Sequence, residues 1–423
     1  MNDLKKYKFN NLYDFTSGLS STPAQAGHGA PFLSFSTVFN NHFVPEELPD
    51  KMDTSEKEQE LFSIKEGDVF LTRTSETIDE LGMSCVAISD YPKATYSGFV
   101  KRLRPLQNDI TYHKFMAYYL RSNFFRKTMT NNAVLTLRAS LNEQIFSYLD
   151  LLLPTYPNQV KIGDLLFVLT QKIQTNEKIN VQLEKLTKTV YDYWFVQFDF
   201  PDKSGKPYKS SGGEMVWNEK LKKNIPKNWG VENLIENSLT ELIKPGIKIF
   251  QEKKRYLTTS DVVGTDINFQ ANFIDYATRE SRANMQPVAN SVWFAKMKNS
   301  KKVMFVGDYS DYLADNYIFS TGFAGIKCMN EYALEYIWGC INSDAFEFLK
   351  DRLSNGATQE AINNGSMKSM PLLVPTGDVL KKYNEKTRQI YKTIYLREIE
   401  NVQLTNLRDW LLPMLMNGQV VIK

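Results

Sequence analysis

The chain has 423 residues, of which 42% are hydrophobic and 13% aromatic, so it is long enough for two or three domains with cores of their own. A formal net charge of only +3 argues against a protein that binds polyanions through bulk charge. Three cysteines without zinc-ligand spacing and the lack of a long apolar run exclude a disulfide scaffold and a membrane-spanning protein, and they indicate the cytoplasm.

The first 150 residues mix short strands with helices. GDVFLT (67–72) is rich in β-branched and aromatic residues and predicts a strand, whereas residues 113–129 predict an amphipathic helix. A long helix is expected over 158–195, because apolar residues recur there every seven positions in two rows. The first row is Ile162, Leu169, Asn176, Leu183 and Val190, and its expected companion is Leu165, Ile179, Leu186 and Tyr193.

The second half follows the same order. Residues 199–227 are rich in Pro, Gly, Ser and Lys and predict a crossing segment. SVWFAKM (291–297) predicts a strand, and residues 331–353 predict an amphipathic helix. A second long helix is expected over about 377–412, and Pro413 is expected to close it, because proline cannot donate the helical hydrogen bond.

A weak duplication covers nearly the whole chain at an offset of 221 to 224 residues, the difference between matched residue numbers. Such a repeat matters for the fold assignment, since a missed repeat gives the wrong architecture. The matches are Tyr7, Asn11 and Leu12 with Trp229, Asn233 and Leu234; Phe32-Leu33 with Tyr256-Leu257; Val69-Phe70-Leu71 with Val292-Trp293-Phe294; Gly98-Phe99 with Gly322-Phe323; Ser122 with Ser343; and Leu151 to Pro154 with Leu372 to Pro375.

The two long helices could pair as an antiparallel coiled coil. Asn176 and Arg397 occupy seam positions, where polar residues can set the register. A 36-residue helix would reach roughly 54 Å at about 1.5 Å per residue. The alternative is that each helix packs only on its own domain.

Motifs for catalysis are missing from the sequence. It contains no Gly-x-x-x-x-Gly-Lys-Ser/Thr loop for ATP and no Asn-Pro-Pro-aromatic or Asp-Pro-Pro-Tyr motif for base methylation. His28, His42 and His113 are too scattered for a metal cluster, and Pro49-Asp50 and Pro201-Asp202 are expected to be solvated turns rather than nuclease sites. The sequence therefore predicts no catalytic residue, no metal site and no cofactor on this chain.

Residues suited to base edges lie at matching places in the two copies. The expected DNA-binding residues of the first copy are Thr72, Arg73, Thr74, Ser75 and Arg138, and those of the second are Lys248, Lys253, Lys254, Arg255, Lys296, Lys298, Thr358 and Gln359. Arg73 corresponds to Lys296, and both lie at the end of a predicted strand. Arg138 and Gln359 could instead cap a helix or tie a domain to its helix, and the 253–255 cluster could be an ordinary solvated loop.

The ordered set of these segments resembles specificity subunits of type I restriction-modification systems over essentially the whole chain. The resemblance rests on GDVFLTRTS (67–75), IPKNWGVENL (225–234), SNGATQEAINNGSMKSMPLLVP (354–375) and LRDWLLPMLMNGQV (407–420). One departure is that GATQ (356–359) is replaced by LTLR (135–138) in the first copy.

The resemblance implies an α+β fold: two similar mixed α/β target-recognition domains separated by two long antiparallel coiled-coil helices, with a pseudo-two-fold internal repeat. We expect the first recognition domain at 1–153, a spacer helix at 154–198, a linker at 199–227, the second recognition domain at 228–375, and a second spacer helix with a tail at 376–423.

The family implies a non-catalytic subunit that reads a bipartite target in double-stranded DNA. Its implied partners are two methyltransferase subunits, which would carry S-adenosylmethionine for adenine methylation, and motor-nuclease restriction subunits. The alternatives are a self-sufficient DNA-modifying enzyme with an unrecognised motif and a coiled-coil scaffold that does not bind DNA.

Overall fold

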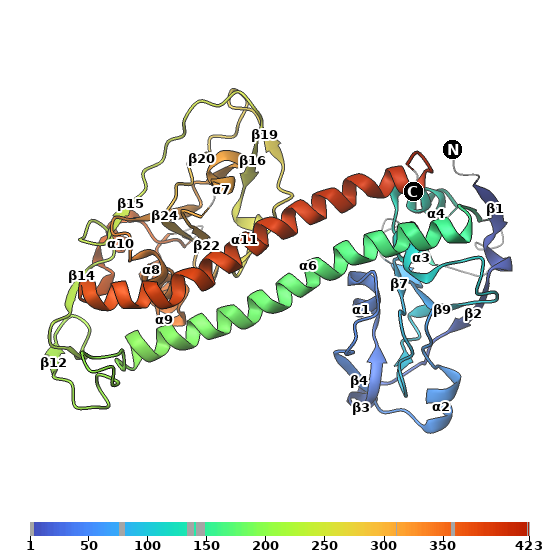
Figure 1. The fold of residues 1–423 in the computed structure, drawn as a ribbon, viewed down its shortest axis with the longest axis horizontal. Coiled ribbons are helices and arrows are strands. Elements are labelled where there is room, and N and C mark those ends of the chain that lie inside the picture. The colour runs from blue at the N-terminus through green and yellow to red at the C-terminus, as the bar shows by residue number, and fades with distance from the viewer. Residues whose placement is uncertain are drawn as a thin grey trace. The chain divides into compact units, whose positions relative to one another are not determined.

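A computed structural model describes residues 4–75, 81–132, 139–140, 149–309, 311–356, 360–420 and 422 (Figure 1). The chain divides into two compact units. Unit 1 comprises Met1–Gln174 with Gln403–Lys423, and unit 2 comprises Thr175–Val402. Each of the long helices therefore contributes one part to either unit. The limits of the five expected domains stay a prediction, because this division falls within the helices.

Unit 1 is built on an antiparallel sheet with the strand order β2-β9-β5-β7. Its strands are β2 (Tyr13–Ser17), β5 (Val69–Thr72), β7 (Ser84–Val86) and β9 (Val100–Pro105). A three-stranded sheet joins β3 (Ala26–Leu33), β4 (Asp50–Met52) and β8 (Thr95–Tyr96), and β1 (Lys5–Lys8) pairs with β11 (Asp150–Leu153). The main helices are α1 (Phe35–Asn40), α2 (Glu56–Leu61), α3 (His113–Tyr119), α4 (Asn123–Asn132) and the start of α6 (Tyr156–Tyr191).

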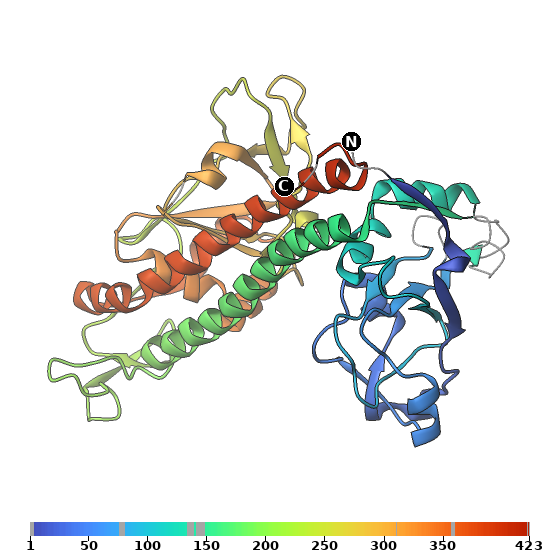
Figure 2. The ribbon, with the colours of Figure 1, turned by 45° about the vertical axis from the view of Figure 1, so that its right-hand side comes forward.

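Unit 2 repeats this plan with the order β15-β24-β21-β22. These strands are β15 (Thr240–Leu242), β21 (Ser291–Ala295), β22 (Val303–Val306) and β24 (Phe323–Cys328). A second sheet joins β16 (Lys254–Leu257), β19 (Phe273–Ile274), β20 (Ala283–Met285) and β23 (Tyr317–Ser320), and β14 (Gly230–Asn233) pairs with β25 (Pro371–Val374). The helices are α7 (Tyr312–Asn316), α8 (Leu334–Ile341), α9 (Asp344–Leu353), α10 (Asn364–Ser369) and most of α11 (Gly377–Met416) (Figure 2).

The strand registers confirm that one module occurs twice. Val69 pairs with Leu103 and Val292 pairs with Ile326, so the central pairing is preserved at an offset of 223 residues. The second sheets agree as well, since β3 runs parallel to β8 and β16 runs parallel to β23, with Phe32 and Tyr256 in equivalent places. The two units thus share topology, although their sequences are only weakly similar.

Two of the sequence matches are wrong in detail. Tyr7 pairs with Leu151 and Glu232 pairs with Leu372, so Tyr7 corresponds to Glu232 and not to Trp229. The cause is a helical turn, η1 (Phe9–Asn11), which adds three residues before Leu12, whereas Leu234 follows β14 directly. The match of Gly98-Phe99 with Gly322-Phe323 is wrong by one position. Val100, not Phe99, corresponds to Phe323, because Val100 and Phe323 pair with the equivalent residues Thr72 and Ala295, respectively.

The expected strands are fully buried, which explains their composition. Every residue of β5 and of β21 is buried, so neither strand needs the alternation that marks a half-exposed strand. Helix α3 is buried over Phe115–Tyr119 and packs on β7, and α8 packs on β21. Gly339 in α8 allows a close approach to α6, since a Cβ there would lie 2.3 Å from the Tyr191 ring. In each unit the sheet and its helices therefore bury an apolar core between them.

Helices α6 and α11 pack against each other within unit 2. Asn176 is buried, and its Nδ2 donates to Glu400 Oε2 and Asn401 Oδ1, each at 2.8 Å. Farther along, Asn180 Nδ2 donates to the carbonyl oxygen of Ile394 at 3.2 Å. Contact positions rise in α6 while they fall in α11, so these segments run antiparallel. Asn176 occupies the predicted seam position.

The companion row of that seam is wrong. Leu165, Leu186 and Tyr193 are exposed, whereas the buried residues lie one position later, at Leu166, Thr187 and Trp194. Thr187 and Asn180, which lies one heptad earlier, are buried but polar. A prediction from hydrophobic spacing therefore chose the apolar residues next to them instead. The interface contains buried polar side chains, and an apolar row on α6 is left facing solvent.

Two further expectations about the chain path differ from the structure. Pro413 does not close α11, because the helix continues to Met416 and Asn417 N donates to Pro413 O at 3.0 Å. A proline so near the end costs only one hydrogen bond in the last turns. The 199–227 region contains a β-hairpin of β12 (Met215–Asn218) and β13 (Lys223–Pro226), and Ile225 is buried in the core.

The remaining global features are simple. Cys85, Cys328 and Cys340 are free thiols. None of the helices formed by the described residues combines the length and apolar character that crossing a bilayer requires. Within the same residues, no group of three or more His, Cys, Asp or Glu side chains is placed to hold a metal ion.

Candidate nucleic-acid interface

The end of the central strand presents a cation at the same place in both units. Arg73 follows β5 and Lys296 follows β21. Arg73 N donates to Phe99 O and Lys296 N donates to Gly322 O, each at 2.9 Å, so the two backbones are held in the same way. Arg73 is exposed and Lys296 is partly buried. The sequence correspondence of these two residues is confirmed, while their contact with DNA stays a prediction.

Thr72 supports this strand end from inside the unit. Its side chain is buried, and its Oγ1 accepts a hydrogen bond from Met83 N at 2.9 Å. Thr74 and Ser75 form the short strand β6 (Thr74–Ser75), which pairs with β10 (Ala139–Ser140). The strand end is therefore extended by a pairing with a segment far along the chain.

Unit 2 repeats this extension. Met297 pairs with Ala361, and Lys298 N donates to Glu360 O at 3.0 Å. The predicted site residues Arg138, Thr358 and Gln359 lie outside the described residues. Of the residues next to them in sequence, Ala139 pairs with Ser75 and Glu360 accepts from Lys298 N, so these two described residues lie beside the strand ends.

The cations of the second strand end differ in their partners. Lys298 Nζ lies 2.6 Å from Glu360 Oε2, so its charge is balanced within the unit. Lys296 has no such ion pair among the described residues. Burial lowers the pKa of Lys296, and the nearby charge of Arg282 lowers it further. Lys296 and Arg282 thus lie close together without a neighbouring carboxylate to balance them among the described residues. The sequence analysis did not predict Arg282 as a site residue.

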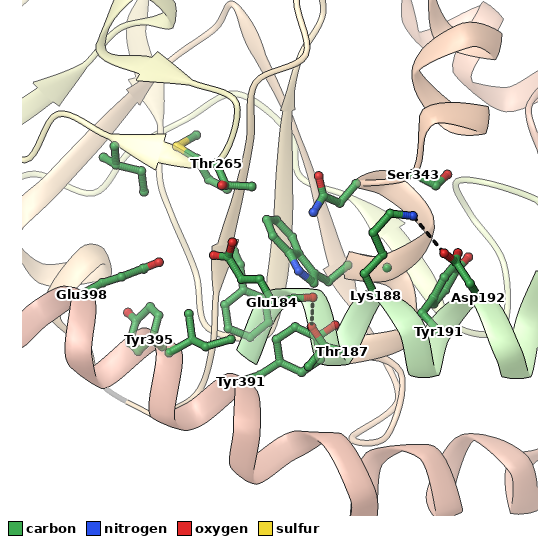
Figure 3. Close-up of a pocket in the computed structure, with 17 residues that line it drawn as sticks. Glu184, Thr187, Lys188, Tyr191, Asp192, Thr265, Ser343, Tyr391, Tyr395 and Glu398 are labelled. Atoms are coloured by element: carbon green, nitrogen blue, oxygen red, sulfur yellow. Dashed lines mark hydrogen bonds and ion pairs between the residues drawn. The ribbon is translucent and has the colours of Figure 1, made fainter. Parts of the chain in front are cut away.

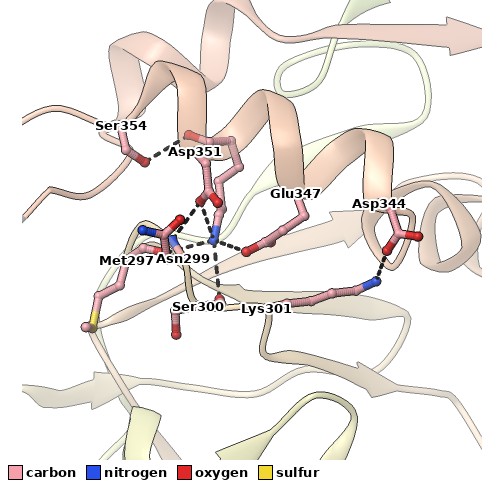
Figure 4. Close-up of polar contacts among 9 residues, drawn as sticks. Met297, Asn299, Ser300, Lys301, Asp344, Glu347, Asp351 and Ser354 are labelled. Atoms are coloured by element: carbon pink, nitrogen blue, oxygen red, sulfur yellow. Dashed lines mark hydrogen bonds and ion pairs between the residues drawn. The ribbon is translucent and has the colours of Figure 1, made fainter.

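A buried lysine holds the loop that carries Lys296 and Lys298. Lys350 on α9 has a fully buried side chain, and its Nζ donates to Met297 O at 2.7 Å and to Ser300 O at 3.3 Å (Figure 4). Glu347 Oε1 at 2.8 Å and Asp351 Oδ1 at 3.3 Å balance its charge. Because buried charges need both counter-charges and hydrogen bonds, Lys350 fixes the loop backbone rather than contacting a ligand. The sequence did not indicate that Lys350 anchors this loop, because a lysine in an amphipathic helix usually faces solvent.

The predicted basic loop of unit 2 is partly structural. Lys248 is exposed, and Lys253 Nζ lies 3.7 Å from Asp275 Oδ2. Lys254 donates to Ala314 O at 3.3 Å, and Arg255 donates to Ala271 O at 2.8 Å. The guanidinium of Arg255 also lies 4.3 Å from the centre of the Phe273 ring. Lys248 and Lys253 therefore project from this loop, whereas Lys254 and Arg255 hold it together.

The corresponding surface of unit 1 carries less positive charge. Its 22–25 turn is closed by Thr22 and Gln25, and His28 Nε2 lies 3.9 Å from Asp53 Oδ2. The loops that lead into the equivalent strands β3 and β16 thus differ in both charge and local structure.

A pocket of about 90 Å³ lies elsewhere in unit 2, between α6, α11 and the sheet (Figure 3). Tyr391, Tyr395 and Trp338 line it together with Glu184 and Glu398. Burial raises the pKa of Glu398 to about 8, and the charges of Glu184 and Asp266 add to the effect. The cation in its lining, Lys188, is already paired with Asp192 at 2.9 Å, so the pocket offers no excess positive charge for phosphate and we do not place nucleic acid there.

Comparisons with known proteins bear on this interface. The family model described as type I restriction modification DNA specificity domain matches residues 20–185. The HindI specificity subunit of Haemophilus influenzae is 22% identical, and the match covers 99% of this chain and 100% of that protein. These matches confirm the resemblance to type I specificity subunits.

Two more type I specificity subunits extend the comparison. The MjaIX specificity subunit of Methanocaldococcus jannaschii is 21% identical over 80% of this chain and 75% of its own length. The crystal structure of the S subunit from M. genitalium has a TM-score of 0.59 and 14% identity, covering 98% of this chain and 96% of that one. That likeness supports the mixed α and β fold of type I specificity subunits for this chain.

Proposed function

We propose that this chain is the DNA sequence-reading subunit of a type I restriction-modification complex. The observation that carries the proposal is the duplicated strand end: Arg73 and Lys296 have the same backbone hydrogen bonds but different surroundings. Arginine and lysine are the side chains that most often contact guanine in the major groove. Two copies of one scaffold with different side chains suit a target made of two different half-sites.

The paired helices would act as a spacer between the two readers. Helices α6 and α11 have 36 and 40 residues, so they would reach about 54 and 60 Å at 1.5 Å per residue. One duplex turn is roughly 34 Å, which leaves room for several unread base pairs between half-sites. Supporting this, the α6 and α11 segments of unit 2 run antiparallel, with Asn176 bonded to both Glu400 and Asn401.

Catalysis would come from partners rather than from this chain. We propose that methyltransferase subunits, two per complex and carrying S-adenosylmethionine, dock on the long helices, and that motor-nuclease subunits join the full assembly. Exposed apolar side chains on both helices of unit 1 fit such a docking surface: Leu165, Val168, Leu407 and Trp410, with exposed fractions of 37%, 59%, 43% and 59%. Among these, Trp410 is the kind of large aromatic residue that often dominates interface energies.

The test uses the chain assembled with its methyltransferase partner and a library of duplexes. Arg73→Ala is expected to relax the base preference in one half-site only, and Lys296→Ala in the other. Lys57→Ala is the matched control, because Lys57 is exposed on α2 of unit 1, outside the proposed surface. Each strand-end variant should lose about tenfold in discrimination at its position.

Other outcomes would contradict the proposal in identifiable ways. An equal loss of affinity for all duplexes would assign Arg73 or Lys296 to phosphate contact. Methyl transfer or cleavage by the isolated chain would favour a self-sufficient enzyme. If the assembled wild-type chain binds no duplex at low salt, the scaffold alternative holds.

A further inference from the structure

The turn that faces the strand-end cation is built alike in both units, yet it carries different residues. Phe99 N donates to Ser97 Oγ at 3.2 Å, and Gly322 N donates to Ser320 Oγ at 3.2 Å. The carbonyl oxygens of Phe99 and Gly322 accept from Arg73 N and Lys296 N. Phe99 and Gly322 therefore occupy the same position, immediately before β9 and β24, respectively, and beside the cation.

In unit 1 this position adds an apolar ring to the surface. The Phe99 side chain is 64% exposed, and it stands on a turn that is fixed by backbone and Ser97 hydrogen bonds. A single exposed apolar residue is common on protein surfaces and means little alone. Its location is what matters here, because the Phe99 backbone is bonded to that of Arg73.

In unit 2 the same position leaves space that another cation fills. A Cβ on residue 322 would lie 3.4 Å from Arg282 Nη2 and 2.9 Å from Thr259 Cγ2. The guanidinium of Arg282 thus lies next to the point where the Phe99 side chain begins in unit 1. Neither Arg282 nor Lys296 has an ion pair within the part of the chain that the structure describes. Adjacent like charges are unfavourable until an acceptor-rich or anionic group binds them.

We propose that this turn position determines what each unit reads beside its strand-end cation. Phe99 gives unit 1 an apolar contact next to Arg73, which suits the methyl group of thymine. Gly322 gives unit 2 the pair Arg282 and Lys296, which suits two neighbouring acceptors such as guanine N7 and O6. The chemistry of the major groove distinguishes bases by these groups. The inference rests on the proposed DNA-reading function and names its contacts.

The experiment is selection of duplexes from a randomised library by the chain assembled with its methyltransferase partner. Phe99→Ala is expected to lose about tenfold of a preference for a thymine-containing pair in one half-site, while Phe99→Leu retains most of it. Arg282→Met is expected to lose about tenfold of a preference for guanine in the other half-site. Arg282→Lys should retain much of the guanine preference, because lysine keeps a cationic donor beside Lys296.

The outcomes separate this inference from the function it rests on. If the wild-type assembly selects no bipartite sequence, the proposed function fails. If the wild-type assembly selects one and Phe99→Ala and Arg282→Met leave both half-sites unchanged, only the inference is overturned. A loss of affinity that is equal for all duplexes and lowers the salt dependence would make Arg282 a phosphate contact, and it would overturn the guanine assignment.

Discussion

Replacing the buried Lys350 by methionine tests how unit 2 holds its strand-end loop. The ammonium group of Lys350 bonds to Met297 O and Ser300 O and balances the carboxylates of Glu347 and Asp351. Breaking a buried ion pair by removing one partner costs about 3–5 kcal/mol. The side chains of Glu347 and Asp351 are 18% and 20% exposed, so water relieves part of this cost and we expect about 3 kcal/mol.

The consequence should be measurable by thermal unfolding. For a unit of the size of Thr175–Val402, 1 kcal/mol corresponds to roughly 2–4 °C, so Lys350→Met should lower the midpoint by about 6–12 °C. In the assembled complex, the same variant should also weaken the base preference assigned to Lys296, because Lys350 holds the loop backbone at Met297. The half-site assigned to Arg73 should be unchanged.

Lys301→Met is the matched control in the same loop. Lys301 Nζ lies 2.6 Å from Asp344 Oδ1, but the two side chains are 37% and 87% exposed (Figure 4). Surface ion pairs of this kind contribute about 0–1 kcal/mol. A midpoint for Lys350→Met that is no lower than that for Lys301→Met would refute the reasoning, since it would mean that burial adds nothing to this network.

Two further predictions concern α11. Glu398 has its pKa raised to about 8, chiefly by burial, from an ordinary value of 4.5. The folded chain keeps a proton that the unfolded chain releases, so this group's contribution to stability falls as pH rises from about 4.5 to 8. Glu398→Gln should therefore reduce the pH dependence of the thermal midpoint over that window, whereas Glu385→Gln, at an exposed position of the same helix, should not. Trp410→Ala should weaken co-purification with the proposed methyltransferase partner without lowering the thermal midpoint of the chain, and Leu61→Ala at another exposed position is the control. Unchanged assembly would place the partner elsewhere.

Much of the architecture was predictable because it depends on patterns that a duplication preserves. Buried strands need continuous apolar runs, and VFLT and SVWFA supplied them at equivalent positions. The pairing of Arg73 with Lys296 followed from the same offset and agrees with the backbone hydrogen bonds. The position of Asn176 at the helix interface was predictable because it lies in a row of apolar residues that recur every seven positions.

The details that failed depend on spacing and on side chains from distant segments. The three residues of η1 shifted the alignment near Tyr7, and buried Thr187 broke the hydrophobic rule that selected exposed Leu186. Arg282 approaches Lys296 from the loop before β20, and Lys350 reaches the same region from α9. No local pattern signals such convergence, because the residues involved are separated by more than ten positions in sequence.

By itself, the sequence determined that one mixed α/β module is present twice, that each copy is followed by a long helix, and that a cation ends each central strand. These features follow from local composition and periodicity, which act over a few residues. Only the tertiary structure decided that Gly322 admits Arg282 where unit 1 carries Phe99, and that Lys350 anchors the loop of unit 2. The side chains that meet at a strand end are set by packing between segments that are distant in sequence. A short insertion such as η1, or a missing Cβ such as that of Gly322, changes which side chains meet.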